Sequence, residues 1–360
     1  MYPRLKVINL KMLYLRSYRI YLRAYLLTLV YILSVFTVIY LSYNSFYHEI
    51  PVDKIQNDKT TITATEISAY NGRRACKPYV LPDPRPFFER EPIPPNLPRR
   101  LENLSDDELY RKLSSLKLLV FSTARNVEAS VDIFRKHIDP IVDLFHSSSR
   151  ILICESDSDD KTLEKLQQWS RAQVYSFSHL SQTYSMRTER IAFCRNRLMN
   201  LTYEIESDYI LHVDLDVFRT DVSSFISNFR YHTDDWAAMT VTSNDVYYDI
   251  WALRTLSDSI LNFDVWHRVW AIEGNGTFCS DSVVEQLIRN HQKHIPIERG
   301  LIEVRSAFNG GGLYRTKMTY GCQYSGADTT CEHVSFHLCI RDKHQGRIFI
   351  NPEFILDTPE

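Results

Sequence analysis

The sequence predicts an α/β domain with a mostly parallel sheet covered by helices, preceded by an N-terminal transmembrane helix and a stem. Three observations support this prediction. Apolar strand patterns alternate with amphipathic helical patterns from residue 116 onward. Residues 24–47 form an apolar run without a charged residue, and a proline-rich segment separates that run from the strands.

Residues 1–23 and 24–47 predict a basic cytosolic tail followed by a transmembrane signal anchor. The tail carries six Lys or Arg and no acid, and the first acid of the chain, Glu49, follows the apolar run. About 20 apolar residues span a bilayer, and the positive flank stays in the cytosol. We therefore expect a single-pass type II protein of the Golgi or endoplasmic reticulum membrane. A cleaved signal peptide is the alternative, although the run is long and no small-x-small cleavage site follows it.

Residues 48–115 predict a stem that holds the folded domain off the membrane. Eight prolines lie between residues 78 and 98, and this density favours extended polyproline segments over helix. A proline-rich ligand for another protein is the alternative. Leu101–Leu116 predicts a short helix, with Ser105 as its N-cap and Glu108 completing a capping box.

Residues 116–360 are enough for one sizeable core and predict the main folded domain. The domain lacks Gly-x-Gly-x-x-Gly, phosphate-loop and Gly-x-Ser-x-Gly motifs, which argues against dinucleotide enzymes, ATPases and serine hydrolases. The expected strands are Leu116–Ser122, Arg150–Cys154, Val174–Phe177 and Tyr209–Val213, and the expected helices are Val127–Phe145, Asp160–Ala172 and Thr188–Leu201.

Sequons, cysteines and charge agree with a lumenal domain. Asn-x-Ser/Thr sequons at Asn103, Asn200 and Asn275 predict glycosylation. The seven cysteines suit an oxidising compartment, a local disulfide is expected within residues 322–339, and the odd count leaves at least one thiol. Cys154 and Cys194 lie in apolar contexts and are expected to be free core cysteines. Without the six cations of the tail, 36 Lys and Arg face 44 Asp and Glu, and this net charge of −8 argues against nucleic acid as a partner.

Asp214 and Asp216 follow directly after the apolar strand Tyr209–Val213. The carboxyl end of a strand in an α/β sheet lies at the ligand-binding edge. Two carboxylates at that edge suit a hard divalent cation that also holds a diphosphate. A solvated acidic turn is the alternative for this pair.

Other polar residues also follow strands. Arg125 could hold phosphate, and Asp157 could accept hydrogen bonds from a base or ribose, although the acids of residues 155–162 also suit a helix N-terminus. The helix before the acidic strand carries a cluster of arginines that could neutralise a negatively charged leaving group. A solvated basic stripe is the alternative for this cluster, which comprises Arg187, Arg190, Arg195 and Arg197.

The order of these blocks resembles that of a GT-A glycosyltransferase, and in particular the fungal capsule-associated α-1,3-mannosyltransferase family and its relatives. The resemblance spans about residues 117–355. In the fungal motif Asn-Asp-Val, only Asp216 is matched, and Asp214 is an addition. The blocks that carry the resemblance are Glu155-Ser156-Asp157-Ser158, Arg190 with Arg195-Asn196, Asp214-Leu215-Asp216-Val217-Phe218, Tyr248–Arg254, Asn309–Arg315 and Cys331–His337.

This resemblance implies a catalytic domain at residues 116–360 that binds a nucleotide-sugar donor, GDP-mannose or a UDP-sugar, across the strand ends. A divalent metal, Mn²⁺ in the first instance, would be held by Asp214, Asp216 and His333, with His337 as the alternative to His333. The donor would contact Arg125, Asp157, Arg190, Arg195 and Asp214. Asp249, Trp251, Gly311 and Gly312 would border the sugar or acceptor pocket. The catalytic candidates are Asp216, Glu332 and Asp328, the last two as general bases.

Each of these roles has a structural alternative. Trp251 also suits a core aromatic, His333 a hydrogen-bonded structural histidine, and the three glycines from Gly310 to Gly312 a hairpin turn. The predicted function is a metal-dependent glycosyltransferase that moves a sugar, with mannose as the first candidate, to a glycan, glycoprotein or glycolipid acceptor in the secretory pathway. The alternatives are a metal-dependent phosphotransferase or pyrophosphorylase, and a membrane-anchored, non-catalytic sugar-binding or scaffold protein of the same fold.

Overall fold

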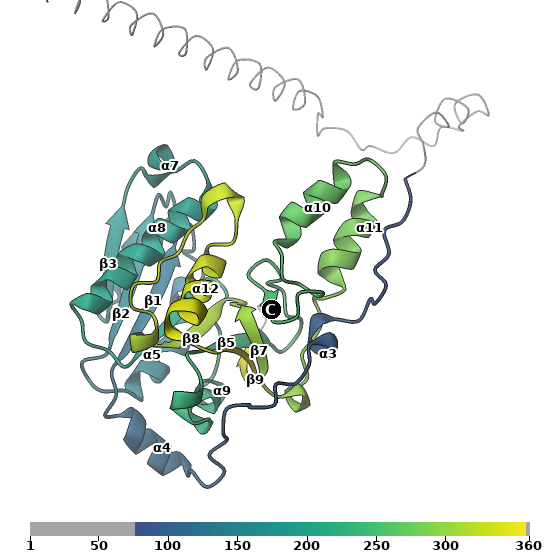
Figure 1. Cartoon of the computed structure of the whole chain (residues 1–360). Helices are drawn as coiled ribbons and strands as arrows, with labels where there is room; N and C mark the ends of the chain where they lie inside the picture. Colours follow the sequence, from purple (N-terminus) through teal and green to yellow (C-terminus); the bar gives the residue numbers. More distant parts are fainter. Residues whose placement is uncertain (1–75, 358–360) are drawn as a thin grey trace, which may run out of the picture. The chain divides into compact units, whose positions relative to one another are not determined.

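A nine-stranded mixed sheet organises the chain in this computed structural model, which describes residues 76–357 (Figure 1). The strand order is β3-β2-β1-β4-β8-β5-β9-β7-β6. The predicted tail, transmembrane helix and first part of the stem lie outside the described residues. The strands are β1 (Leu118–Ala124), β2 (Arg150–Ser156), β3 (Ala172–Phe177), β4 (Tyr209–Asp214), β5 (Ala238–Ser243), β6 (Arg254–Thr255), β7 (Ile302–Ser306), β8 (Gly311–Arg315) and β9 (Ile348–Leu356).

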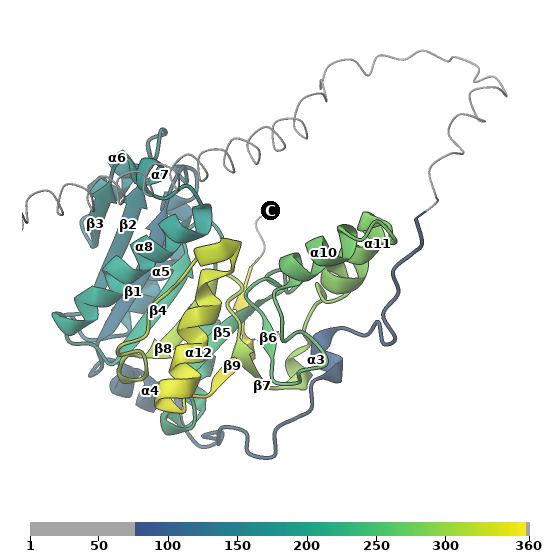
Figure 2. The ribbon, with the colours of Figure 1, turned by 45° about the horizontal axis from the view of Figure 1, so that its top comes forward.

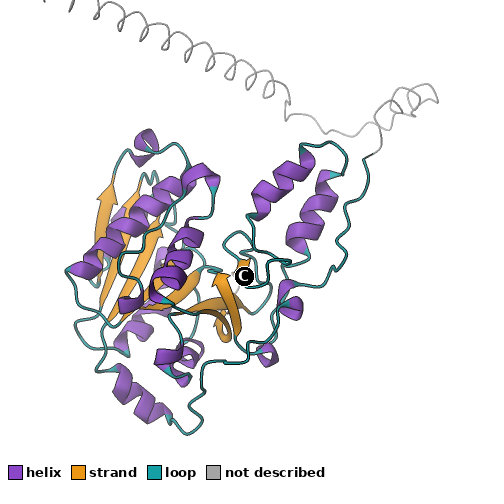
Figure 3. Ribbon diagram, in the orientation of Figure 1, coloured by secondary structure: helices purple, strands orange, loops and turns teal. Residues whose placement is uncertain are grey.

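Helices flank the sheet on both faces (Figure 3). Between residues 76 and 357, no helix combines the length and the apolar character needed to cross a membrane. The helices are α3 (Phe87–Arg90), α4 (Asp106–Leu113), α5 (Val131–Asp143), α6 (Thr162–Gln168), α7 (Leu180–Thr183), α8 (Arg187–Asn200), α9 (Val222–Ile226), α10 (Val265–Glu273), α11 (Ser280–Val284) and α12 (Glu332–His344).

The predicted α/β class is confirmed, but the sheet is mixed rather than mostly parallel. Strands β1 to β4 pair in parallel, as the alternation of strands and helices predicted. Strand β8 then inserts between β4 and β5 and runs antiparallel to both. A turn that can reverse the chain precedes β8, because Asn309 and Gly310 both adopt positive φ values.

Alternate residues of the strands supply two apolar layers, as the period of a strand requires. Leu119 and Phe121 of β1 pack in the layer that contains Leu198 of α8 and Phe336 of α12. Leu118 and Val120 face the opposite layer, which contains the buried side of α5. Helices α8 and α12 lie side by side on one face of the sheet (Figure 2).

The predicted elements are recovered with shifted ends. The capping box of α4 is confirmed, because the Ser105 side chain accepts from the backbone N–H of Glu108 while the Glu108 carboxylate accepts from that of Ser105. Helix α5 begins four residues later than predicted. The segment before it is held as a loop, because the backbone N–H of Val127 donates to Thr162 Oγ1 at 2.8 Å.

The segment 76–115, expected as the second part of the stem, packs on the sheet domain. Phe87 and Phe88 are buried in the main core, and Arg299 donates to the backbone carbonyls of Phe88 and Glu91. The segment also contains one end of a disulfide, Cys76–Cys279. These contacts make residues 76–115 part of the folded unit.

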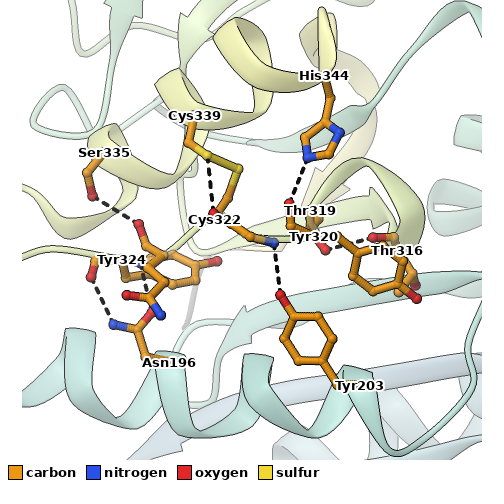
Figure 4. Close-up of a disulfide and its surroundings, with 12 residues drawn as sticks. Asn196, Tyr203, Thr316, Thr319, Tyr320, Cys322, Tyr324, Ser335, Cys339 and His344 are labelled. Atoms are coloured by element: carbon orange, nitrogen blue, oxygen red, sulfur yellow. Dashed lines mark hydrogen bonds between the residues drawn. A yellow bond between two sulfur atoms is a disulfide. The ribbon is translucent and has the colours of Figure 1, made fainter.

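Three disulfides join the described cysteines. The local bond predicted within residues 322–339 is Cys322–Cys339 (Figure 4). The prediction of free core thiols at Cys154 and Cys194 is wrong, because these two residues form a disulfide between β2 and α8. The prediction that both are buried is confirmed, but an apolar context does not reveal which residues meet in space. Cys331 is the free, buried thiol.

Candidate active site

A cavity of about 410 Å³ lies where β1, β2 and β4 end. This edge is where open α/β sheets bind ligands. The sequence analysis did not assign a site role to Tyr248 or Phe308, which also line the cavity. The predicted site residues that line it are Arg125, Arg190, Arg195, Asp214, Asp216, Asp249, Trp251, Glu332 and His333.

Arg195 lies at the centre of a buried charge cluster in the cavity wall. Its guanidinium lies 2.7 Å from Asp214 Oδ1 and 3.1 Å from Glu332 Oε1. The Arg195 side chain is 3 % exposed. Burial alone would lower the pKa of Arg195, but Glu332 and Asp214 outweigh it and raise that pKa further. A guanidinium so placed keeps a permanent positive charge beside the carboxylates.

The same cluster sets the charge of Asp214. Burial raises the pKa of the Asp214 carboxyl to about 6, although Arg195 opposes this shift. The nearby Asp216 carboxylate also raises the pKa of Asp214. Asp214 ends β4, and its backbone N–H donates to the Gly310 carbonyl at 3.0 Å, so the turn before β8 fixes its position.

His333 contacts Arg195 rather than the predicted metal partners. An Arg195 Nη1–H donates to His333 Nδ1 at 3.1 Å, and the ring stacks on Phe308 with centroids 3.6 Å apart. If Nδ1 accepts, the neutral ring carries its proton on Nε2, which has no lone pair to offer a metal. Burial lowers the pKa of His333 well below its usual range, so the ring is neutral. His333 is therefore placed as a partner of Arg195.

The alternative ligand His337 is engaged through both ring nitrogens. Its Nδ1 lies 2.9 Å from Ser306 Oγ and its Nε2 lies 2.8 Å from Tyr314 Oη. The described residues contain no group of three or more His, Cys, Asp or Glu side chains arranged to hold a metal ion. Asp216, in contrast, is exposed at the cavity and forms no hydrogen bond or ion pair with any described residue. The carboxylates of Asp214 and Asp216 fit a divalent cation that takes further ligands from a bound diphosphate, whereas the histidines do not.

Asp249 and Asn309 hold each other at the cavity wall. The Asp249 carboxylate accepts from the backbone N–H groups of Ala252 at 3.0 Å and Asn309 at 3.2 Å. The Asn309 side chain in turn accepts from the backbone N–H groups of Tyr248 and Asp249. Asn309 is fully buried and was missed by the sequence analysis, although the Asn-Gly pair is a turn signal. Burial raises the pKa of Asp249 despite these two hydrogen bonds.

Trp251 connects the cavity with α10. Its Nε1–H donates to Asp264 Oδ2 at 2.9 Å, and the other Asp264 oxygen caps the N-terminus of α10. Arg254 also pairs with Asp264, at 3.1 Å. The Trp251 ring is therefore both a half-buried structural aromatic and a wall of the cavity.

Four predicted site residues do not line the cavity. Asp157 accepts from the backbone N–H of Ser181 at 2.8 Å and so anchors the turn into α7. Asp328 lies in an exposed turn with a φ of 55°. Gly311 and Gly312 are buried within β8, where a Cβ on Gly312 would lie 2.7 Å from Tyr314 Oη. Close packing inside the sheet accounts for these two glycines.

The predicted basic cluster divides between the cavity and the surface. Arg187 and Arg190 line the cavity, and Arg190 donates to the carbonyls of Tyr184 and Ser185. Arg125 and Arg187 are exposed and form no hydrogen bond or ion pair within residues 76–357. Arg197 instead lies over the Phe177 ring, outside the cavity wall. Two arginines are therefore available to an anionic ligand without breaking an internal contact.

The asparagines of all three sequons are exposed. The hydroxyl of Thr202, in the second sequon, donates to the Met199 carbonyl and is buried. A glycan at Asn200 would therefore have to be added before this helix end is folded.

Comparison with known proteins gives weak structural likenesses. No protein-family model and no curated protein matches the sequence. One similar structure is glucosyl-3-phosphoglycerate synthase from Mycobacterium tuberculosis in complex with UDP, at 13 % identity and a TM-score of 0.39, over 71 % of this chain and 74 % of that one. Another is a mannosyltransferase from Pyrobaculum calidifontis in complex with GDP-Man and Mn²⁺, at 10 % identity and a TM-score of 0.40, over 68 % of this chain and 56 % of that one.

Proposed function

We propose that this chain is a metal-dependent glycosyltransferase of the GT-A type. It moves a sugar from a nucleotide-sugar donor to a hydroxyl of a glycan or glycoconjugate acceptor. The observation that carries the proposal is the cavity at the strand ends, whose wall combines arginines with carboxylates. The cavity wall contains Arg125, Arg187, Arg190 and Arg195, together with Asp214, Asp216, Asp249 and Glu332.

The balance of charge supports a diphosphate together with a divalent cation. With His333 neutral, the four arginines and four acids of the wall cancel. A doubly charged diphosphate alone would leave an uncompensated negative charge in the cavity, and a divalent cation restores neutrality. Such a cation, Mn²⁺ in the first instance, would be held by the carboxylates of Asp216 and Asp214 and would supply positive charge that stabilises a departing diphosphate.

The arginines bind and orient the donor. Arg125 and Arg187 place unpaired guanidinium groups at the cavity, and planar guanidinium groups bind phosphate oxygens in pairs. Arg195 keeps one oxygen of Asp214 and one of Glu332 in fixed positions. Positive charge that is already in place requires no reorganisation as the diphosphate departs.

Glu332 is the acid best placed to act as a general base, because it lines the cavity at the N-terminus of α12. The Asp249 carboxylate accepts from the backbone N–H groups of Ala252 and Asn309 and so positions the turn that carries Trp251. Trp251 then offers a ring face to the transferred sugar or the acceptor. This assignment leaves Asp328 without a role in proton transfer.

The donor sugar and the cellular location belong to the same proposal. The resemblance to capsule-associated mannosyltransferases favours mannose from GDP-mannose, with UDP-sugars as the alternative. A signal anchor at residues 24–47 would place the domain in the lumen of the Golgi or endoplasmic reticulum. The three disulfides and the exposed sequons support an oxidising compartment.

The test uses a soluble fragment of residues 75–360, which form one compact unit. The fragment is incubated with GDP-mannose or individual UDP-sugars and a mixture of acceptor glycans, with and without Mn²⁺, and release of nucleoside diphosphate is measured. Asp216→Ala should lower release by about a hundredfold or more. Asp342→Ala, an exposed acid on α12 away from the cavity, should behave like the wild type.

Two results would contradict the proposal. The first is the absence of release from every donor by a folded fragment, which would favour a non-catalytic sugar-binding protein. The second is release that persists unchanged in Asp216→Ala or without a divalent ion.

A further inference from the structure

One face of α8 forms the positively charged wall of the cavity. Arg187, Arg190, Ile191 and Cys194 follow one another at spacings of three, one and three residues, which places them on a single helix face. All four line the cavity. The height and rotation of α8 over the sheet therefore decide where the arginines meet a ligand.

The Cys154–Cys194 disulfide attaches this face to the end of β2. Cys154 also lines the cavity, and the two Cα atoms lie 5.5 Å apart. Cys194 comes one helical turn after Arg190 and directly before Arg195. The covalent bond thus lies between the two arginines that the sequence analysis assigned to the donor.

The other hydrogen bonds and ion pairs of α8 lead to elements other than β2. The Thr188 hydroxyl donates to the Gly326 carbonyl at 2.7 Å. The Asn196 side chain exchanges two hydrogen bonds with the backbone of Tyr324, which Figure 4 shows near the Cys322–Cys339 disulfide. Both contacts join α8 to the segment before α12, and the ion pairs of Arg195 join it to the end of β4 and the start of α12. None of these contacts reaches β2, so the disulfide and apolar packing set the position of α8 over that strand.

We propose that Cys154 and Cys194 are positioning residues for the donor diphosphate, and this inference rests on the proposed function. Their disulfide fixes the arginine-bearing face of α8 at the height of the strand ends. Without it, the helix retains its links to residues 324–326 and to Asp214 but gains freedom to rotate or tilt relative to β2. Arg187 and Arg190 then no longer meet the diphosphate in the geometry that binds it most tightly.

The test compares Cys154→Ala/Cys194→Ala with Cys322→Ala/Cys339→Ala in the full-length chain. The second pair is a matched control, because it joins α12 to the loop before it and neither residue lines the cavity. The first variant should raise the KM for the donor sugar nucleotide about tenfold, with kcat changed less than threefold. Its affinity for UDP or GDP, measured by calorimetry, should fall by the same factor. The control should keep the wild-type KM and affinity, although it loses stability.

If the Cys154→Ala/Cys194→Ala variant does not fold, a third measurement on the wild type tests the inference. Dithiothreitol reduces disulfides of the folded wild type to pairs of thiols and is itself oxidised to a cyclic disulfide. Alkylation followed by mass spectrometry then identifies which pair has been reduced. The donor KM should rise in step with alkylation of Cys154 and Cys194 and not with that of Cys322 and Cys339. Equal effects of the two pairs, or a wild-type KM without the Cys154–Cys194 bond, would overturn the inference. A wild-type chain that is inactive with every donor would instead refute the proposed function itself.

Discussion

Replacing Arg195 by methionine should strongly destabilise the domain. Methionine keeps much of the side-chain volume but removes the charge that lies 2.7 Å from Asp214 and 3.1 Å from Glu332. Breaking a buried ion pair by deleting one partner costs about 3–5 kcal/mol, because the remaining charge stays buried and unpaired. Glu332 is 7 % exposed and Asp214 is 30 % exposed, so Glu332 bears most of this cost. We expect a loss of about 3 kcal/mol at pH 8.

The loss should depend on pH in a predictable direction. Burial raises the pKa of Asp214 to about 6 even with Arg195 opposing the shift, so removal of Arg195 raises that pKa further above its unfolded value. The native state of the variant then binds a proton more readily than the unfolded state, and its stability falls as pH rises through the raised pKa and recovers as pH falls below it. The difference between Arg195→Met and the wild type should therefore be larger at pH 8 than at pH 5.

Urea unfolding of the 75–360 fragment at both pH values measures this difference. Arg190→Met is the matched control, because Arg190 lies on the same helix and, among residues 76–357, donates only to two backbone carbonyls. It should lose about 1 kcal/mol, with little change between the two pH values. An equal loss in both variants, or a larger loss for Arg195→Met at pH 5, would refute the assignment of Arg195 as the counter-ion of the buried acids.

Three further predictions concern stability. Gly310→Ala should lower the free energy of unfolding in urea by about 2–4 kcal/mol. Gly310 has a φ of +92°, and a Cβ there would lie 2.7 Å from Val217 Cγ2. Gly276→Ala is the control and should cost about 1 kcal/mol, because Gly276 has a φ of +62° but open space around it. Burial lowers the pKa of His291 to about 4, so the stability that the neutral ring contributes is complete above pH 6.5 and is lost as pH falls toward 4. In His291→Asn, the stability lost between pH 7 and pH 4 should be smaller than in the wild type by about 3 kcal/mol. An unchanged dependence of stability on pH would contradict this prediction. Loss of the Cys76–Cys279 disulfide, which closes a separation of 203 residues, should destabilise the domain by about 5 kcal/mol. Loss of Cys322–Cys339, with a separation of 17 residues, should cost about 3 kcal/mol. The reverse order in matched double-alanine variants would count against this loop-closure reasoning.

Local patterns were enough to predict the parallel half of the sheet and the edge that carries the cavity. The apolar run of β4 and the acids after it are features of one short segment, and strand ends in such sheets meet at one edge. The sequence alone therefore predicted that Asp214 and Asp216 lie at the same edge as Arg125, and all three line the cavity. The antiparallel insertion of β8 was not predicted, because a five-residue strand carries no mark of its partners.

Pairings between distant residues could not be derived in this way. Arg195 and Glu332 belong to different helices. The residues next to His333 in the sequence do not indicate that the Arg195 guanidinium donates to its Nδ1 atom. The same limit explains why Cys154 and Cys194 were taken for isolated thiols. Asn309 was overlooked for another reason, because its effect on Asp249 is exerted through backbone N–H groups that sequence patterns do not register.

The bond between Cys76 and Cys279 decides how the protein responds to a protease. A cut before residue 76 would release a unit with its full core, including the buried rings of Phe87 and Phe88. A single cut in an exposed loop between Cys76 and Cys279 would leave both pieces joined until the bond is reduced. A fragment shortened to begin near residue 100 would lose those rings and expose a solitary thiol at the start of α11, where copies of the chain could become cross-linked. Among single cuts, only one on the N-terminal side of Cys76 therefore yields this folded unit as one uninterrupted chain.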